Sequence, residues 1–180
     1  MMAFLWLAGL ALGCFGVGSA SAQMEIFEAA KTGDIVRVEQ LLESEHSALD
    51  YDVNGSTILH YAASGGQAKV AALLIARGAD VNAANKDGFT PLHNCALSGN
   101  SETAVTLLGG GGILYARDNN EMTPLHLCGL SNNVDVAKIL VGHGADVNDK
   151  TSTLWTPLRV AEYKSNKELI EWLRAQGANE

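Results

Sequence analysis

The sequence predicts an all-α solenoid of about five helix-turn-helix units with short β-hairpin loops between them. Two phrases that recur in one register, and one feature of composition, predict this fold. Glycines divide each repeat into two apolar stretches too short to be stable helices alone, so neighbouring units must stack. A second phrase, Gly-Ala-Asp-Val-Asn, begins at Gly78 and again two periods later at Gly144. The main phrase begins with threonines spaced by 33 residues throughout, at Thr57, Thr90, Thr123 and Thr156.

The main phrase also identifies a family. It reads Thr-Pro-Leu-His from Thr90 and from Thr123, Thr-Ile-Leu-His from Thr57 and Thr-Pro-Leu-Arg from Thr156. From Met24 to Glu180 the chain resembles the ankyrin-repeat family, which has this period and a Thr-Pro-Leu-His-x-Ala signature. The resemblance implies a monomeric, non-catalytic module that needs no cofactor and binds another protein on its concave surface.

Length and charge limit the partners. A chain of 180 residues with 47% hydrophobic residues is long enough for one domain with a core. Its net charge is −8, and every charged side chain lies at Glu25 or later. An acidic surface argues against binding of nucleic acid and of anionic membranes by the mature protein.

The first 22 residues have a different composition from the repeats. Residues 4–17 are uncharged and apolar, and Ala20-Ser21-Ala22 follows as an Ala-x-Ala motif. This pattern predicts a signal peptide over residues 1–22, and hence an exported, periplasmic or secreted, bacterial protein with a domain over residues 23–180. Two alternatives are lipid attachment at Cys14 and retention of the segment as a membrane anchor, although the apolar run is short for a spanning helix.

The repeat register gives five units, at about residues 24–51, 52–84, 85–117, 118–150 and 151–180. The first unit lacks the Thr, Pro and His of the phrase, as expected for a terminal unit. In the second unit we expect helices over residues 58–64 and 68–77, with Gly78 as the C-terminal cap. In the third unit, Gly109 and Gly110 fall in the last helical turn and should weaken it. In the fifth unit, Lys167 and Arg174 replace Val134 and Val141, which gives the last helix a polar outer face.

His60, His93 and His126 are the candidate metal ligands. Equivalent residues of adjacent units lie roughly 8–10 Å apart, whereas zinc needs its nitrogens about 2 Å from one point. The resemblance implies that these histidines instead bond to backbone groups between units. Residues 50–55 also open like a calcium-binding EF-hand loop, but Tyr61 occupies the position of the required glutamate. We therefore expect no metal site.

Cys95 and Cys128 provide the alternative function, a redox-responsive accessory protein of the cell envelope. They are one repeat apart, beyond the separation of about 7 Å that a disulfide permits between Cα atoms. The simpler interpretation is that both are small buried hydrophobic residues.

The predicted binding surface follows from register. The positions immediately before each threonine and seven after it face the groove in ankyrin repeats, and in units three to five both rows become apolar. Large apolar side chains in adjacent rows form patches that mark interaction sites. If these residues instead cover the hairpins, the candidate site moves to the hairpin tips at residues 86–87, 119–120 and 152–153. The predicted partner-binding residues are Phe89, Leu97, Met122, Leu130, Trp155 and Tyr163.

Overall fold

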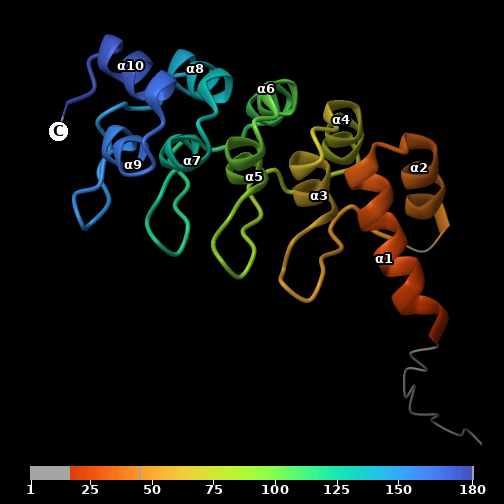
Figure 1. The fold of residues 1–180 in the computed structure, drawn as a ribbon. Helices are drawn as coiled ribbons and strands as arrows, with labels where there is room; N and C mark the ends of the chain where they lie inside the picture. The colour runs from red at the N-terminus through yellow and green to blue at the C-terminus, as the bar shows by residue number, and fades with distance from the viewer. Residues whose placement is uncertain (1–16, 45, 180) are drawn as a thin grey trace, which may run out of the picture.

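The chain folds into a row of helix pairs (Figure 1). The computed structural model describes residues 17–44 and 46–179, and of residues 17–23 it describes only the backbone. The predicted all-α repeat architecture is confirmed, because the described residues form ten helices in five consecutive pairs. The pairs are α1 Val17–Thr32 with α2 Ile35–Ser44, α3 Ile58–Ser64 with α4 Ala68–Ala76, α5 Pro91–Ser98 with α6 Ser101–Gly109, α7 Pro124–Ser131 with α8 Val134–Gly142, and α9 Pro157–Tyr163 with α10 Lys167–Ala175.

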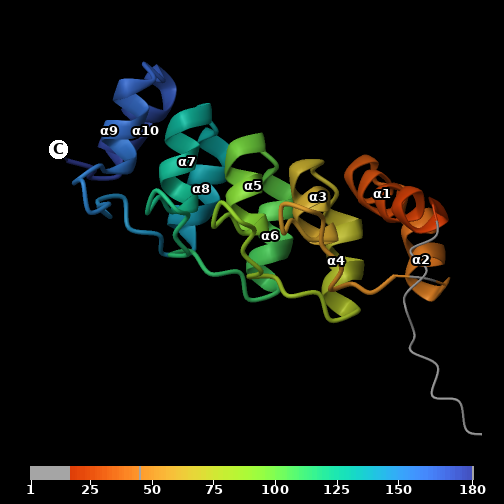
Figure 2. The same cartoon turned by 90° about the horizontal axis from the view of Figure 1, so that it is seen from below.

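The helices form two rows. The first helices of the pairs pack against one another in the order α1, α3, α5, α7, α9, and the second helices form the row behind them. The hairpin loops project from one edge of the first row (Figure 1), and a view from below shows them side by side along the stack (Figure 2). The first helices and the hairpins therefore share one continuous face.

A threonine starts the first helix of units two to four. Its side chain accepts a hydrogen bond from the backbone N–H three residues later, and the histidine ring at that later position accepts one from the threonine N–H. This is a capping box in which histidine replaces the usual glutamate. Proline at the first helical position supports the same start in units three to five.

A glycine ends the second helix. Gly78 has φ +87°, its N–H donates to Ile75 O at 3.0 Å, and the N–H of Ala79 donates to Leu74 O at 2.9 Å. This pair of hydrogen bonds forms a Schellman cap, which requires a residue in the left-handed conformation. The predicted cap is confirmed, and the helix ends at Ala76, one residue before the predicted end.

The hairpins are short. Asp52 N–H donates to Ser56 O and Gly55 N–H to Asp52 O, both at 2.9 Å, and the same pattern recurs in the next three units. This is a type I turn followed by one left-handed residue. The left-handed position is occupied by Gly55 and Gly88, but in the last two units by Glu121 and Leu154. Among the described residues the only β-bridge pairs Tyr51 with Thr57.

The two ends of the stack differ from the middle. Helix α1 begins at Val17, seven residues before the first unit's expected start, so its backbone is helical at Ala22, after which cleavage is predicted. The rest of the predicted signal peptide, including Cys14, lies outside the described residues. At the other end, α10 buries Leu169 and Leu173 and exposes Lys167 and Arg174, which confirms the polar outer face predicted for this helix. No helix in the described part is both long and apolar enough to cross a membrane.

Gly109→Ala should stabilise the protein. Gly109 is the last residue of α6, and a Cβ there would meet no atom within 4 Å. Alanine should therefore add about 1 kcal/mol of helix propensity, or roughly 2–4 °C in melting temperature for a protein of this size. Calorimetry measures this, and hydrogen exchange of the wild type should be faster at residues 106–112 than at 73–79.

The control for this prediction is Gly111→Ala, two residues further on. Gly111 has φ +93°, which strains alanine even where there is space, so this variant should melt lower than the wild type. The neighbouring Gly110 is also restricted, because its Cβ would lie 3.0 Å from Ile75 Cδ1. A Gly109→Ala protein that melts no higher than the wild type would contradict the prediction.

Candidate functional site

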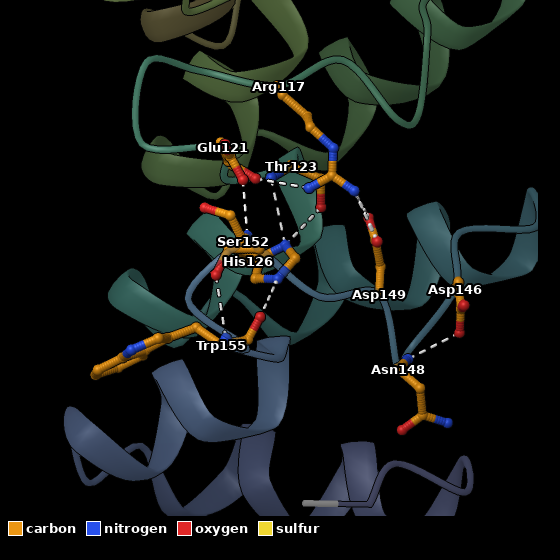
Figure 3. A network of polar contacts seen from close by, with 10 residues as sticks. Arg117, Glu121, Thr123, His126, Asp146, Asn148, Asp149, Ser152 and Trp155 are labelled. Carbon is orange, nitrogen blue, oxygen red and sulfur yellow. Dashed lines mark hydrogen bonds and ion pairs between the residues drawn. The ribbon is translucent and has the colours of Figure 1, made fainter.

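Three buried histidines link neighbouring units through hydrogen bonds. In each, Nδ1 accepts the N–H of the threonine three residues earlier, so Nε2 carries the proton and donates it to a carbonyl of the next unit. His60 Nε2 lies 2.8 Å from Phe89 O, His93 Nε2 3.1 Å from Met122 O, and His126 Nε2 3.0 Å from Trp155 O. Figure 3 shows His126 between Thr123 and Trp155 in this role. The backbone of each residue before a threonine is thus held by the preceding unit.

Burial keeps these three histidine rings neutral. The pKa values of His60, His93 and His126 are lowered, chiefly because burial disfavours the charged ring, with the carbonyl contacts opposing this. Both nitrogens of each ring already have protein partners. Within the described part of the chain, no three His, Cys, Asp or Glu side chains are grouped to hold a metal ion.

The structure brings four of the six predicted partner-binding residues together. Met122, Leu130, Trp155 and Tyr163 line a hollow of about 640 Å³ between the fourth and fifth units, here called the C-terminal hollow. Tyr163 is 70% exposed, while the other three are half-buried. Both predicted rows therefore reach one concavity.

Phe89 and Leu97 do not line this hollow. Phe89 stacks on His93, with ring centroids 5.7 Å apart and planes 7° apart, and both Phe89 and Leu97 pack against the core. The predicted binding surface spans units three to five, but the hollow is formed by units four and five only. The ring of Phe89 lies against the buried ring of His93 instead.

Two aromatic rings form the far wall of the C-terminal hollow. Trp155 and Tyr163 meet edge to face, with centroids 5.5 Å apart and planes at 78°. The Arg159 guanidinium lies 5.2 Å from the Trp155 ring and Lys164 Nζ lies 5.6 Å from the Tyr163 ring. Edge-to-face contact between rings and cations over ring faces are both favourable arrangements, so these contacts favour the observed orientation of the two rings.

Glu121 joins the two hairpins that line the C-terminal hollow (Figure 3). Its Oε2 accepts the Ser152 N–H at 2.7 Å, and its backbone carbonyl accepts from Arg117, which also pairs with Asp149 at 2.8 Å. The hydrogen bonds with Ser152, and secondarily the charge of Arg117, lower the pKa of Glu121. The hairpin tips at residues 119–120 and 152–153, the alternative site predicted from the sequence, also line this hollow. Glu121 and Lys164 line it too but are not among the predicted residues.

The two cysteines are buried away from this surface. Cys95 and Cys128 are free and fully buried, and burial raises the pKa of the Cys95 thiol to about 12 and that of Cys128 further. A thiol must ionise and be reached by its oxidant to react. The alternative redox function therefore finds no support in the geometry of the folded protein.

Comparison with known proteins identifies the family. The model for ankyrin repeats (3 copies) matches residues 26–114 and 106–180, so the chain belongs to the ankyrin-repeat family. It is also similar to an ankyrin repeat protein of fowlpox virus (strain NVSL), at 41% identity over 68 residues. That alignment covers 37% of this chain and 17% of the viral protein. Ankyrin repeats are in general protein-binding modules and typically not enzymes.

Proposed function

We propose that this protein binds another protein in the C-terminal hollow, without catalysis. The single observation that carries the proposal is the meeting of Met122, Leu130, Trp155 and Tyr163 around one concavity of about 640 Å³. Preformed apolar concavities with a few polar groups at the rim are the usual form of a binding site. Tryptophan and tyrosine are also the residues most enriched among binding hot spots.

The shape and charge of the surface describe the partner. The hollow spans two units at a stacking distance of about 10 Å each, so it accommodates one or two apolar side chains of an extended or helical segment. Both Glu121 and Lys164 line the hollow, so its rim carries both signs of charge and suits a partner without a large net charge at this contact. The hairpin tips at Asn119, Asn120 and Thr153 line the hollow and can bond to the partner's backbone.

Photo-crosslinking can identify the partner. A benzophenone amino acid in place of Tyr163 should crosslink to it in the native extract. The matched control replaces Tyr115, which is also exposed but does not line the hollow. A protein captured equally from both positions, or from position 115 alone, would contradict the proposed site.

Trp155→Ala should then weaken binding of that partner by about 30-fold or more, which corresponds to about 2 kcal/mol. The melting temperature should change little, because Trp155 is fixed in the fold through its backbone. Its backbone N–H donates to Thr151 Oγ1, and its backbone carbonyl accepts a hydrogen bond from His126 Nε2. Calorimetric titration measures the affinity, with Ile113→Ala as an exposed apolar control outside the hollow. A variant that unfolds but keeps its affinity in the folded fraction would make Trp155 a capping residue.

We also propose that the protein is exported. The uncharged apolar run and the Ala20-Ser21-Ala22 motif support cleavage after Ala22, which leaves Gln23 as the first residue. Intact mass spectrometry of protein from its native compartment tests this. A mass that includes Met1 to Ala22, or a lipid on Cys14, would contradict it.

A further inference from the structure

A second hollow lies at the opposite end of the stack, here called the N-terminal hollow. It has a volume of about 450 Å³ and lies between α1 of the first unit and the hairpin and first helix of the second. Its apolar lining comes from Met24, Phe27, Val53 and Tyr61. The C-terminal hollow shares none of these residues.

The floor of the N-terminal hollow is rigid and its walls are exposed. Phe27 and Tyr61 form the floor, with ring centroids 5.0 Å apart, and Tyr61 Oη donates to Asp52 Oδ2 at 2.8 Å. Met24 and Val53 form the walls and are 75% and 84% exposed. Two large apolar side chains this exposed on either side of an aromatic floor mark a surface suited to an inserted side chain.

The surroundings of the N-terminal hollow are strongly acidic. Glu28 and Asp52 stand among its lining residues, and Glu28 has no ion pair among the described residues. Residues 24–56 contain eight acidic and two basic side chains, a net charge of −6 of the chain's −8. Burial, the hydrogen bond from Tyr61 to Asp52, and the charges of Asp52 and Glu28 together raise the pKa of Tyr61 to about 12. The potential at this hollow is therefore negative.

We propose that the N-terminal hollow binds a cationic protein segment, with one long apolar side chain over the Phe27–Tyr61 pair and lysine or arginine side chains at Glu28 and Asp52. Charge complementarity selects this occupant. The chain's own residues 1–22 are apolar but contain no lysine or arginine, and a second copy would bring another charge of −8. Anionic lipid is repelled by the same acidic surface. The inference is independent of the function proposed for the C-terminal hollow.

The test uses the full chain, labelled with ¹⁵N, and the capped peptide Lys-Arg-Lys-Leu-Lys-Arg-Lys as the probe. Amide signals of residues 27–28, 53–54 and 61 should shift on titration. A peptide with serine in place of leucine should bind about tenfold more weakly, because the apolar contact is lost. A peptide with glutamate at the six basic positions should not bind. Raising the salt from 0.05 to 0.5 M should weaken the first peptide at least about tenfold.

Variants locate the site. Val53→Ser and Glu28→Gln should each weaken binding of the leucine peptide about fivefold or more without changing the melting temperature, since both side chains are exposed. The matched controls are Val105→Ser and Glu171→Gln, which are exposed elsewhere on the stack and should bind like the wild type.

Three results would overturn the proposal. Shifts centred on residues 155 and 163 would place the peptide in the C-terminal hollow. Equal affinity for the leucine and serine peptides would show charge attraction without a site. Binding that appears only after removal of residues 1–22 would make the chain's own N-terminal segment the occupant.

Discussion

Gly65→Ala should separate the first unit from the second and lower the stability of the stack by about 3 kcal/mol or more. A Cβ at Gly65 would lie 2.0 Å from the backbone oxygen of Lys31 and 2.8 Å from its carbonyl carbon. Both obstacles are backbone atoms, so rotation of a side chain cannot relieve them. Helices α1 and α3 would have to move apart, which puts the cost at or above the upper end of overpacking in a core.

The loss should be local. In a repeat array each unit contacts only its neighbours, so the damage should fall on the first interface. Hydrogen exchange of the α1 amides from residue 24 to residue 32 should accelerate strongly, while exchange in α7 and α9 stays close to that of the wild type. Helical content should fall by the contribution of α1 and α2, as measured by circular dichroism.

Gly142→Ala is the matched control for Gly65→Ala. Gly142 is the last residue of α8 and Gly65 is the C-cap just after α3, so both lie at a helix end, but a Cβ at Gly142 would meet no atom within 4 Å. The same chemical change should therefore be neutral or stabilising. If Gly65→Ala were as stable as Gly142→Ala, the close approach of α3 to α1 would be disproved.

The periodic elements of this fold could be predicted from the sequence, because local signals there coincide with the register. Helix α3 has the predicted bounds of residues 58–64, set by Thr57 at its start and Gly65 at its end. The start of α1 could not be predicted. The first unit lacks a capping threonine, so no residue marks where the helix should begin, and it extends back to Val17.

The lining of the C-terminal hollow could be predicted only in part, for a different reason. Register places a side chain in a row, but it does not give the ring orientation that commits Phe89 to His93. The C-terminal hollow also depends on Glu121, which joins two hairpins from a left-handed position that is glycine in the second and third units. Such a contact depends on tertiary geometry and has no repeat to reveal it. The N-terminal hollow could not be predicted from the repeat register, because the first unit lacks the repeated phrase.

The second large effect is expected for His93→Ala, which should destabilise the protein by about 2–5 kcal/mol without changing its metal content. The substitution leaves two buried backbone groups without a partner, the N–H of Thr90 and the carbonyl of Met122, which lie 3.1 Å from the ring nitrogens. Each unsatisfied buried group costs about 1–3 kcal/mol. The vacated ring also leaves a space beneath Phe89, which stacks on it. Denaturant unfolding measures the loss.

His143→Ala is the control for this effect. His143 is exposed, and its Nδ1 contacts only Ile139 O in its own helix, so its removal should change stability little. Elemental analysis of wild type and both variants completes the comparison. A stoichiometric ion that disappears in His93→Ala but not in His143→Ala would show that the buried histidines are metal ligands.

The pH dependence of stability gives an independent check on the neutral histidines. His60, His93 and His126 have pKa values lowered in the fold, mainly by burial, whereas in the unfolded chain they titrate near 6.5. The unfolded chain thus binds more protons below pH 6.5, so their contribution is complete above that pH and is lost as the pH falls toward the lowered values. Each histidine adds up to about 1.4 kcal/mol per pH unit to the slope in this window. His93→Ala should therefore have a shallower slope of stability against pH below about pH 6.5 than His143→Ala. Equal slopes in the two variants would mean that the pKa of His93 is not lowered in the fold, which would contradict its burial as a neutral acceptor of the Thr90 N–H.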